Sequence, residues 1–181
     1  MIAKDTLNEK QLLRMQMRAL FRENQECDSE AHQNAILSLP EWNAATTILL
    51  YSPLLKEPDP RPLMSHCGNK RFYFPRIDGE ILEIYRHTME SQWITGPFGL
   101  REPDPLNWER TSLDEIDLAL IPGLAFDEEA VRLGRGGGFY DRMLGDSNFR
   151  GMKIGLCWQW QLIPFVPREA HDITMDRVIT G

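Results

Sequence analysis

A chain of 181 residues, with 42% hydrophobic and 26% charged residues, has the composition of a globular domain that can bury its own core. Its formal net charge of −7 counts against a general nucleic-acid-binding protein, because such proteins are usually basic. The 3 cysteines are dispersed, which argues against a disulfide framework or a structural zinc site. No apolar run reaches membrane-spanning length and the N-terminus lacks a signal-peptide core, so we expect a cytoplasmic protein without a membrane partner.

The predicted elements alternate between helices and strands along the chain. Helices are expected at Leu7–Glu23, from Asp28 or Ser29 to Pro40, at Arg61–His66 and at Phe139–Leu144. Strands are expected at Thr46–Tyr51, Arg71–Pro75, Glu80–Arg86, Leu118–Ile121 and Lys153–Trp158. The segment Thr88–Ser112 is typical of irregular surface structure, and its tryptophans are expected to pack. This order predicts one α/β domain over residues 1–181, with a mainly parallel open sheet flanked by helices in a Rossmann-like three-layer arrangement.

The first predicted helix carries a basic face. Lys10, Arg14 and Arg18 recur at intervals of four residues, so they lie on one side of the helix. Taken alone, this pattern favours a solvated surface over a binding site.

The most informative pattern follows the strand predicted at Leu118–Ile121. Arg132, Gly134, Arg135 and the run Gly136–Gly138 precede the short predicted helix. Glycines let backbone N–H groups converge without obstruction by Cβ atoms, and guanidinium groups offer forked donors suited to phosphate oxygens. The segment therefore indicates a polyphosphate-binding loop, with a flexible turn as the alternative.

Two better-known phosphate-binding motifs do not fit this segment. A Walker A loop requires Gly-Lys-Ser/Thr after the glycines, and that sequence is missing. In a dinucleotide fingerprint counted from Gly134, the last glycine would fall on Phe139. Asp141, one turn into the helix, could hold a magnesium ion against phosphate oxygens.

The same segment resembles the signature of the 5-formyltetrahydrofolate cyclo-ligases, also called methenyltetrahydrofolate synthetases. The family pattern is proline-glycine-x-(Ala/Gly)-Phe-Asp and, after a spacer, Arg-Leu-Gly-x-Gly-x-Gly-(Tyr/Phe)-Tyr-Asp. It is met here by Pro122, Gly123, Ala125, Phe126, Asp127, Arg132, Leu133, Gly134, Gly136, Gly138, Phe139, Tyr140 and Asp141. Ala130 is a departure, since the family commonly has glycine there. If that position needs a positive φ, alanine would be strained.

The resemblance implies ligand-binding residues spread along the chain. ATP binding falls to Lys10, Arg14, Arg132, Gly134, Arg135, Gly136, Gly137, Gly138, Phe139 and Tyr140. Binding of the reduced folate falls to Ser52, Glu57, Arg135, Gly136, Gly137, Gly138 and Phe139. Arg132 and Arg135 would be catalytic, and Asp141 and Asp172 would be ligands of Mg²⁺. Asp176 is expected to be structural, Gln161 matches a family glutamine without an assigned role, and Gly99–Pro103 resembles a Gly-x-x-Glu-Pro element of the family.

The implied activity is the ATP-dependent conversion of 5-formyltetrahydrofolate to 5,10-methenyltetrahydrofolate, with release of ADP and phosphate. The expected partners are therefore small molecules and not nucleic acids, while the oligomeric state is left open. One alternative is a non-catalytic folate- or nucleotide-binding member, suggested by Ala130 and by Pro58 and Pro60, which replace family residues beside Glu57. A second alternative, an RNA-associated module of this fold, gains little support from the acidic composition.

Overall fold

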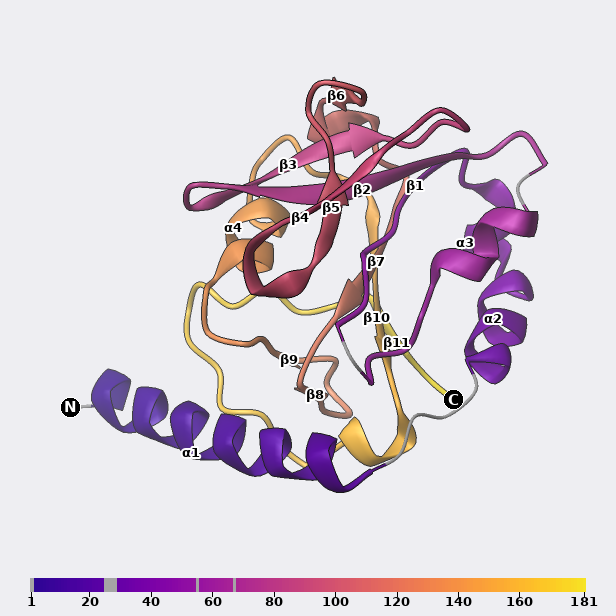
Figure 1. Ribbon diagram of the computed structural model, residues 1–181. Coiled ribbons are helices and arrows are strands. Elements are labelled where there is room, and N and C mark those ends of the chain that lie inside the picture. Colours follow the sequence, from indigo (N-terminus) through magenta and orange to yellow (C-terminus); the bar gives the residue numbers. More distant parts are fainter. Residues whose placement is uncertain (1, 25–28, 55, 67) are drawn as a thin grey trace.

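The computed structural model describes residues 2–24, 29–54, 56–66 and 68–181. In this part of the chain, a seven-stranded sheet with the order β11-β10-β7-β1-β2-β3-β6 forms the centre (Figure 1). Its strands are β1 (Thr47–Leu49), β2 (Arg71–Asp78), β3 (Ile81–Arg86), β6 (Glu109–Thr111), β7 (Leu118–Pro122), β10 (Met152–Cys157) and β11 (Arg177–Thr180). The strands from β11 to β2 are parallel, whereas β3 and β6 run antiparallel to their neighbours. The predicted single α/β domain with a mainly parallel sheet is confirmed.

Helices cover both faces of the sheet, as β7 illustrates. Leu118 and Leu120 pack in the cluster that contains Trp42 and the helices α2 (Glu30–Leu37) and α3 (Pro40–Ala44). Ala119 and Ile121 belong to the opposite cluster, which includes α4 (Phe139–Leu144). Figure 1 shows α2 and α3 on one side of the sheet and α4 on the other. Because side chains alternate along a strand that is buried on both faces, a nearly continuous apolar run was the correct signal for β7.

The first helix, α1 (Ile2–Glu23), lies apart from these layers, beside the hairpin of β8 (Ala125–Phe126) and β9 (Arg132–Leu133) (Figure 1). Its buried Met17 and Phe21 pack in a separate cluster with Leu124, Val131 and Val166. The helix starts before the predicted Leu7. Among the described helices, none combines the length and the hydrophobicity that a bilayer crossing requires.

Some predicted boundaries were wrong. The helix predicted to end at Pro40 ends at Leu37, and the separate helix α3 begins at Pro40; the suggested start at Asp28 lies outside the described residues. The sequence also did not predict β11, which pairs with β10. Short 3₁₀ helices occur at η1 (Arg61–His66), η3 (Leu113–Glu115) and η4 (Gln159–Gln161).

The segment 88–112 is more regular than predicted. It contains β4 (Trp93–Thr95), η2 (Pro97–Gly99), β5 (Arg101–Pro103) and β6, and β4 pairs with β5. Trp93 and Trp108 pack edge-on against Phe74, with ring centroids 4.9 Å and 6.0 Å away. The expectation that these tryptophans pack is therefore confirmed, and their packing fixes the segment against β2.

The β8–β9 hairpin contains the alanine that departs from the family pattern. Ala130 has a φ of +59°, so the predicted strain is present. The turn is held by the buried Asp127. Its Oδ1 accepts hydrogen bonds from the N–H groups of Glu129 and Val131 at 3.0 Å and 2.9 Å, and its Oδ2 accepts one from Val166 at 2.9 Å. The three hydrogen bonds to the carboxylate of Asp127 thus hold the turn in a conformation that alanine at position 130 disfavours.

We expect Ala130→Gly to stabilise the protein, because glycine adopts a positive φ without steric cost. Relief of the left-handed conformation outweighs the entropy that glycine adds to the unfolded chain, so the free energy of unfolding should rise by about 0.5–1 kcal/mol. Denaturant unfolding measures this change. Ala44→Gly, at an exposed position of α3, is the matched control and should lower the free energy of unfolding. A loss of stability in both variants would contradict the assignment of strain to Ala130.

Candidate active site

The candidate site lies where the sheet order changes direction. From β1, the chain leads to β2 on one side, while β7 pairs on the other side of β1. In an open α/β sheet, the carboxyl ends of the two strands that flank such a point form a natural crevice. The loop with Ser52 and Glu57 follows β1, and Gly123 and the β8–β9 hairpin follow β7. A cavity of about 710 Å³ occupies this position.

All the residues that were predicted from the sequence to bind ATP, folate or Mg²⁺ lie in the wall of this cavity. They are Lys10, Arg14, Ser52, Glu57, Arg132, Gly134, Arg135, Gly136, Gly137, Gly138, Phe139, Tyr140, Asp141 and Asp172. The cavity is also lined by residues to which the sequence assigned no role, among them Tyr51, Phe98, Glu102, Glu169 and His171. Segments separated by more than 150 residues therefore meet at one site.

The glycine-rich loop requires its glycines for conformation. Gly136 has a φ of +111° and Gly138, which precedes α4, has a φ of +67°, and L-residues with side chains rarely adopt such values. The loop carbonyls are bound by arginines from outside the loop. Arg14 Nε donates to Gly134 O at 3.0 Å, and Arg18 Nη2 donates to Arg135 O at 3.2 Å. The basic face of α1 therefore contacts the loop directly, and the interpretation of it as a merely solvated surface is wrong.

In the described part of the chain, three of the four predicted phosphate-binding cations, Lys10, Arg132 and Arg135, also pair with carboxylates. Arg132 Nη2 lies 2.9 Å from Asp141 Oδ2, and Arg135 Nη2 lies 2.6 Å from Glu57 Oε1. The guanidinium of Arg132 is also 5.4 Å from the ring centroid of Tyr140, in cation–π range. These pairs align the arginines at the cavity wall and balance charge that would otherwise be buried.

Lys10 is the most deeply buried cation of the site, with 3% of its surface exposed. Its Nζ donates to Glu169 Oε2 at 2.8 Å and to Asp172 Oδ2. Although burial raises the pKa of Asp172, the backbone N–H of Glu169 and the Lys10 ammonium together hold it below its ordinary value. The Asp172 carboxylate is therefore ionised at neutral pH. Burial, together with the charge of Arg18, lowers the pKa of Arg14.

The carboxylates of the cavity fit a hard divalent cation. Asp172 Oδ2 is used by Lys10 and by the N–H of Glu169, whereas Asp172 Oδ1 is 3.9 Å from His171 Nε2, beyond hydrogen-bond distance. Ligand atoms of Glu169, His171 and Asp172 lie within 4.8 Å of one another. Carboxylate oxygens are the ligands that Mg²⁺ prefers, and the predicted ligand Asp172 belongs to this cluster, whereas the predicted ligand Asp141 lines the same cavity but is not one of the three residues of the cluster.

The loop that presents Glu57 is tied to the end of α1. Glu57 Oε2 accepts a hydrogen bond from Leu54 N at 2.9 Å. The neighbouring Lys56 donates from Nζ to the carbonyls of Arg22 and Asn24 at 2.9 Å and 2.7 Å, and its own carbonyl accepts from Trp158 Nε1 at 2.8 Å. Lys56 therefore connects the predicted folate-binding loop to the helix that carries Lys10. No sequence pattern predicts this role, because Lys56 and its two carbonyl partners are more than 30 residues apart in the chain.

Two residues from the family pattern have structural contacts. Gln161 is fully buried and donates from Nε2 to the carbonyls of Gly123 and Leu124, which fixes the turn after β7. Asp176 accepts hydrogen bonds from the backbone and side-chain nitrogens of Lys153 on β10. Neither residue lines the cavity.

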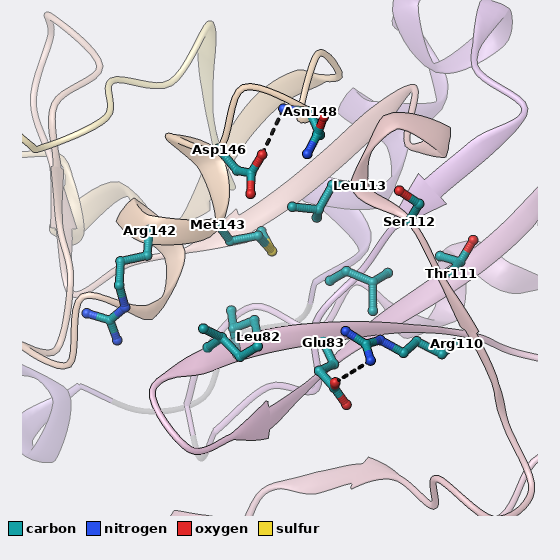
Figure 2. Close-up of a pocket in the computed structure, with 12 residues that line it drawn as sticks. Leu82, Glu83, Arg110, Thr111, Ser112, Leu113, Arg142, Met143, Asp146 and Asn148 are labelled. Atoms are coloured by element: carbon teal, nitrogen blue, oxygen red, sulfur yellow. Dashed lines mark hydrogen bonds and ion pairs between the residues drawn. The ribbon is translucent and has the colours of Figure 1, made fainter.

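A second, smaller cavity of about 260 Å³ lies between β3, β6 and α4. Figure 2 shows its polar rim, where Arg110 Nη1 pairs with Glu83 Oε1 at 2.9 Å and Asp146 Oδ1 accepts from Asn148 N. None of the residues that were predicted to bind ATP, folate or Mg²⁺ lies in the wall of this smaller cavity. The residues around it provide controls for experiments on the larger cavity.

Comparison with known proteins agrees with the pattern of the glycine-rich loop. The sequence model of the 5-formyltetrahydrofolate cyclo-ligase family matches residues 3–181, so this chain belongs to that family. It is 28% identical to the 5-formyltetrahydrofolate cyclo-ligase of Escherichia coli (strain K12) over 176 residues, which cover 93% of this chain and 96% of the relative. It is 32% identical to that of Haemophilus influenzae over 152 residues, or 80% and 81% of the two chains. The NMR structure of Aquifex aeolicus 5,10-methenyltetrahydrofolate synthetase aligns with a TM-score of 0.82 at 31% identity, covering 94% of this chain and 89% of that one.

We expect Lys10→Met to destabilise the protein strongly, because it leaves two carboxylates without their buried counter-charge. The loss in free energy of unfolding should be about 3 kcal/mol. The double variant Lys10→Met/Asp172→Asn removes both charges of the pair and should recover part of that loss, as measured by denaturant unfolding. Strictly additive effects of the two substitutions would show that the pair is not coupled.

Proposed function

We propose that this protein catalyses the ATP-dependent conversion of 5-formyltetrahydrofolate to 5,10-methenyltetrahydrofolate, with release of ADP and phosphate. The observation that carries the proposal is the convergence of a glycine-rich loop, six Lys and Arg side chains and several carboxylates on one cavity, in a chain that belongs to the cyclo-ligase family. The cavity volume of about 710 Å³ is within the range of small-molecule sites. We propose that the protein acts in the cytoplasm on these small molecules.

The nucleotide end of the site is assigned to the loop and its cations. Lys10, Arg14, Arg132 and Arg135 neutralise the triphosphate oxygens, and backbone N–H groups of residues 134–138 hydrogen-bond to them. Because Lys10, Arg132 and Arg135 are paired with carboxylates in the structure, phosphate oxygens would compete for the same N–H donors. Asp141 and Asp172 would hold Mg²⁺, which when bound supplies positive charge against the phosphate oxygens.

The folate end of the site is assigned to the loop after β1. Ser52 and Glu57 line the cavity there, and Arg135 joins Glu57 to the glycine-rich loop. Phe139 contributes an aromatic face against which a flat ring can pack. The ion pair between Arg135 and Glu57 thus places the two halves of the site side by side, as transfer between two bound substrates requires.

The reaction follows from the chemistry of the two substrates. The formyl oxygen at N5 attacks the γ-phosphorus of ATP, the bond from that phosphorus to ADP breaks, and an iminium phosphate forms. N10 then attacks the formyl carbon, the carbon–oxygen bond breaks, phosphate leaves and N10 loses its proton. Arg132 and Arg135 stabilise the charge on the transferring group, and no protein nucleophile is needed.

We expect Arg132→Ala and Asp141→Ala each to lower kcat by about 10²–10³-fold, because each removes a charge that the transferring phosphoryl group requires. The absorbance of methenyltetrahydrofolate, followed with and without ATP and Mg²⁺, measures turnover. Arg132→Lys keeps the positive charge without the forked donors, and Asp141→Asn keeps the side-chain shape without the charge, so these variants separate loss of chemistry from loss of fold. Arg110→Ala, outside the cavity, is the control and should turn over normally.

Near-normal turnover in the Arg132 or Asp141 variants would contradict the assigned roles. Absence of turnover in the wild-type protein, with folate and ATP still bound, would instead support the non-catalytic alternative that Ala130, Pro58 and Pro60 suggest.

A further inference from the structure

One wall of the large cavity comes from a segment to which the sequence assigned no site. Phe98, in η2, and Leu100 both precede β5, and Pro75 and Ile77 belong to the neighbouring β2. Glu102, in the middle of β5, adds a carboxylate that is only 3% exposed. The wall is therefore largely apolar, with an acidic group buried in it.

Glu102 is buried, and no cation of the described residues forms an ion pair with it. Its Oε1 accepts a hydrogen bond from Ile77 N at 3.2 Å. Burial raises the pKa of Glu102, an effect that the Ile77 N–H and the charge of Arg76 only partly offset. A buried carboxylate with so little compensation is costly, and such groups cluster at binding sites.

The fold makes room for this carboxylate. A Cβ atom at Gly96 would lie 2.1 Å from Glu102 Oε2, so any other residue at that position would displace the side chain. Gly96 N donates to Leu100 O at 2.8 Å, which closes the turn between β4 and β5 around the carboxylate. Glycine at position 96 and glutamate at position 102 thus form one local arrangement.

The two buried glutamates of the cavity differ in what they can still accept. Both oxygens of Glu57 are engaged, Oε1 by Arg135 and Oε2 by Leu54 N. For Glu102, the hydrogen bonds of the described residues involve Oε1 alone. Glu102 is therefore the carboxylate with accepting capacity left for a ligand that carries N–H donors.

We propose that Glu102 recognises the pyrimidine edge of the pterin ring of the reduced folate, a role that rests on the function proposed above. That edge carries two adjacent donors, the 2-amino group and N3–H, and a carboxylate accepts such a pair with both oxygens. Phe98, Leu100 and Ile77 provide an apolar surface for the flat ring. Glu102 thus determines specificity for the pterin and takes no part in phosphoryl transfer.

The test compares two ligands on three proteins by isothermal titration calorimetry. The ligands are 5-formyltetrahydrofolate and its 2-desamino analogue, and the proteins are wild type, Glu102→Ala and Glu102→Gln. Wild type should bind the analogue about tenfold more weakly than the parent folate, because the carboxylate loses a charge-assisted donor. In Glu102→Ala, the parent folate should bind about tenfold more weakly, and the difference between the two ligands should largely disappear. Glu102→Gln should be intermediate.

Glu83→Gln is the matched control, since it changes a mostly buried carboxylate of β3 that pairs with Arg110 beside the smaller cavity (Figure 2). It should retain the wild-type affinities for both ligands. If Glu102→Ala weakens both ligands equally, the carboxylate only supports β2 and the proposal is overturned. Equal binding of the two ligands to wild type overturns it as well, without reliance on any variant's fold.

The outcome is separable from that of the proposed function. Folate binding that depends on Glu102, in a protein without ATP-dependent turnover, would uphold this inference and overturn the catalytic proposal. Normal ATP-dependent turnover, with equal affinities of the wild-type protein for the two ligands, would uphold the catalytic proposal and overturn the role of Glu102.

Discussion

The buried contact between Lys10 and Asp172 joins the first helix to the last loop of the chain, and the candidate site depends on it. Around it, Arg14 and Arg18 bind carbonyls of the glycine-rich loop, and Met17 anchors the same helix in an apolar cluster. An α/β sheet alone offers an open crevice at its carboxyl edge. Here, α1 closes one side of that crevice and turns it into a cavity, and Lys10, Arg14 and Arg18 of the helix add positive charge to the cavity wall.

The same pairing has a consequence for ligand binding. A buried cation is costly unless it is paired, and a site for polyphosphate needs several cations together. The structure brings several cations together in one cavity and pairs Lys10, Arg132 and Arg135 with carboxylates. Arg132 with Asp141, and Lys10 with Asp172, are such pairs. If phosphate and Mg²⁺ bind together as proposed, the cations would exchange carboxylate oxygens for phosphate oxygens and the carboxylates would exchange the cations for Mg²⁺. The charges of the site would then stay balanced with and without ligands.

Local patterns gave the most reliable predictions. The apolar run of β7 and the glycine-rich loop depend on neighbouring residues, and each was predicted from the sequence. Strain at Ala130 was expected from the family pattern on the condition that the position has a positive φ, which it has. Features that depend on distant contacts were missed. β11 is a strand only because it pairs with β10, and the 88–112 segment gains its order from packing of Trp93 and other aromatic rings. Glu102 looked like a family motif without a role, and its burial in the cavity wall could be recognised only once β2 and β5 were in place.

The most direct test of this account is a crystal structure of the protein with a non-hydrolysable ATP analogue and Mg²⁺. The account predicts that the triphosphate lies against the backbone of residues 134–138, with Lys10, Arg132 and Arg135 on its oxygens and the ion held by Asp141 and Asp172. A nucleotide bound elsewhere, with no phosphate oxygen in contact with that loop, would contradict it.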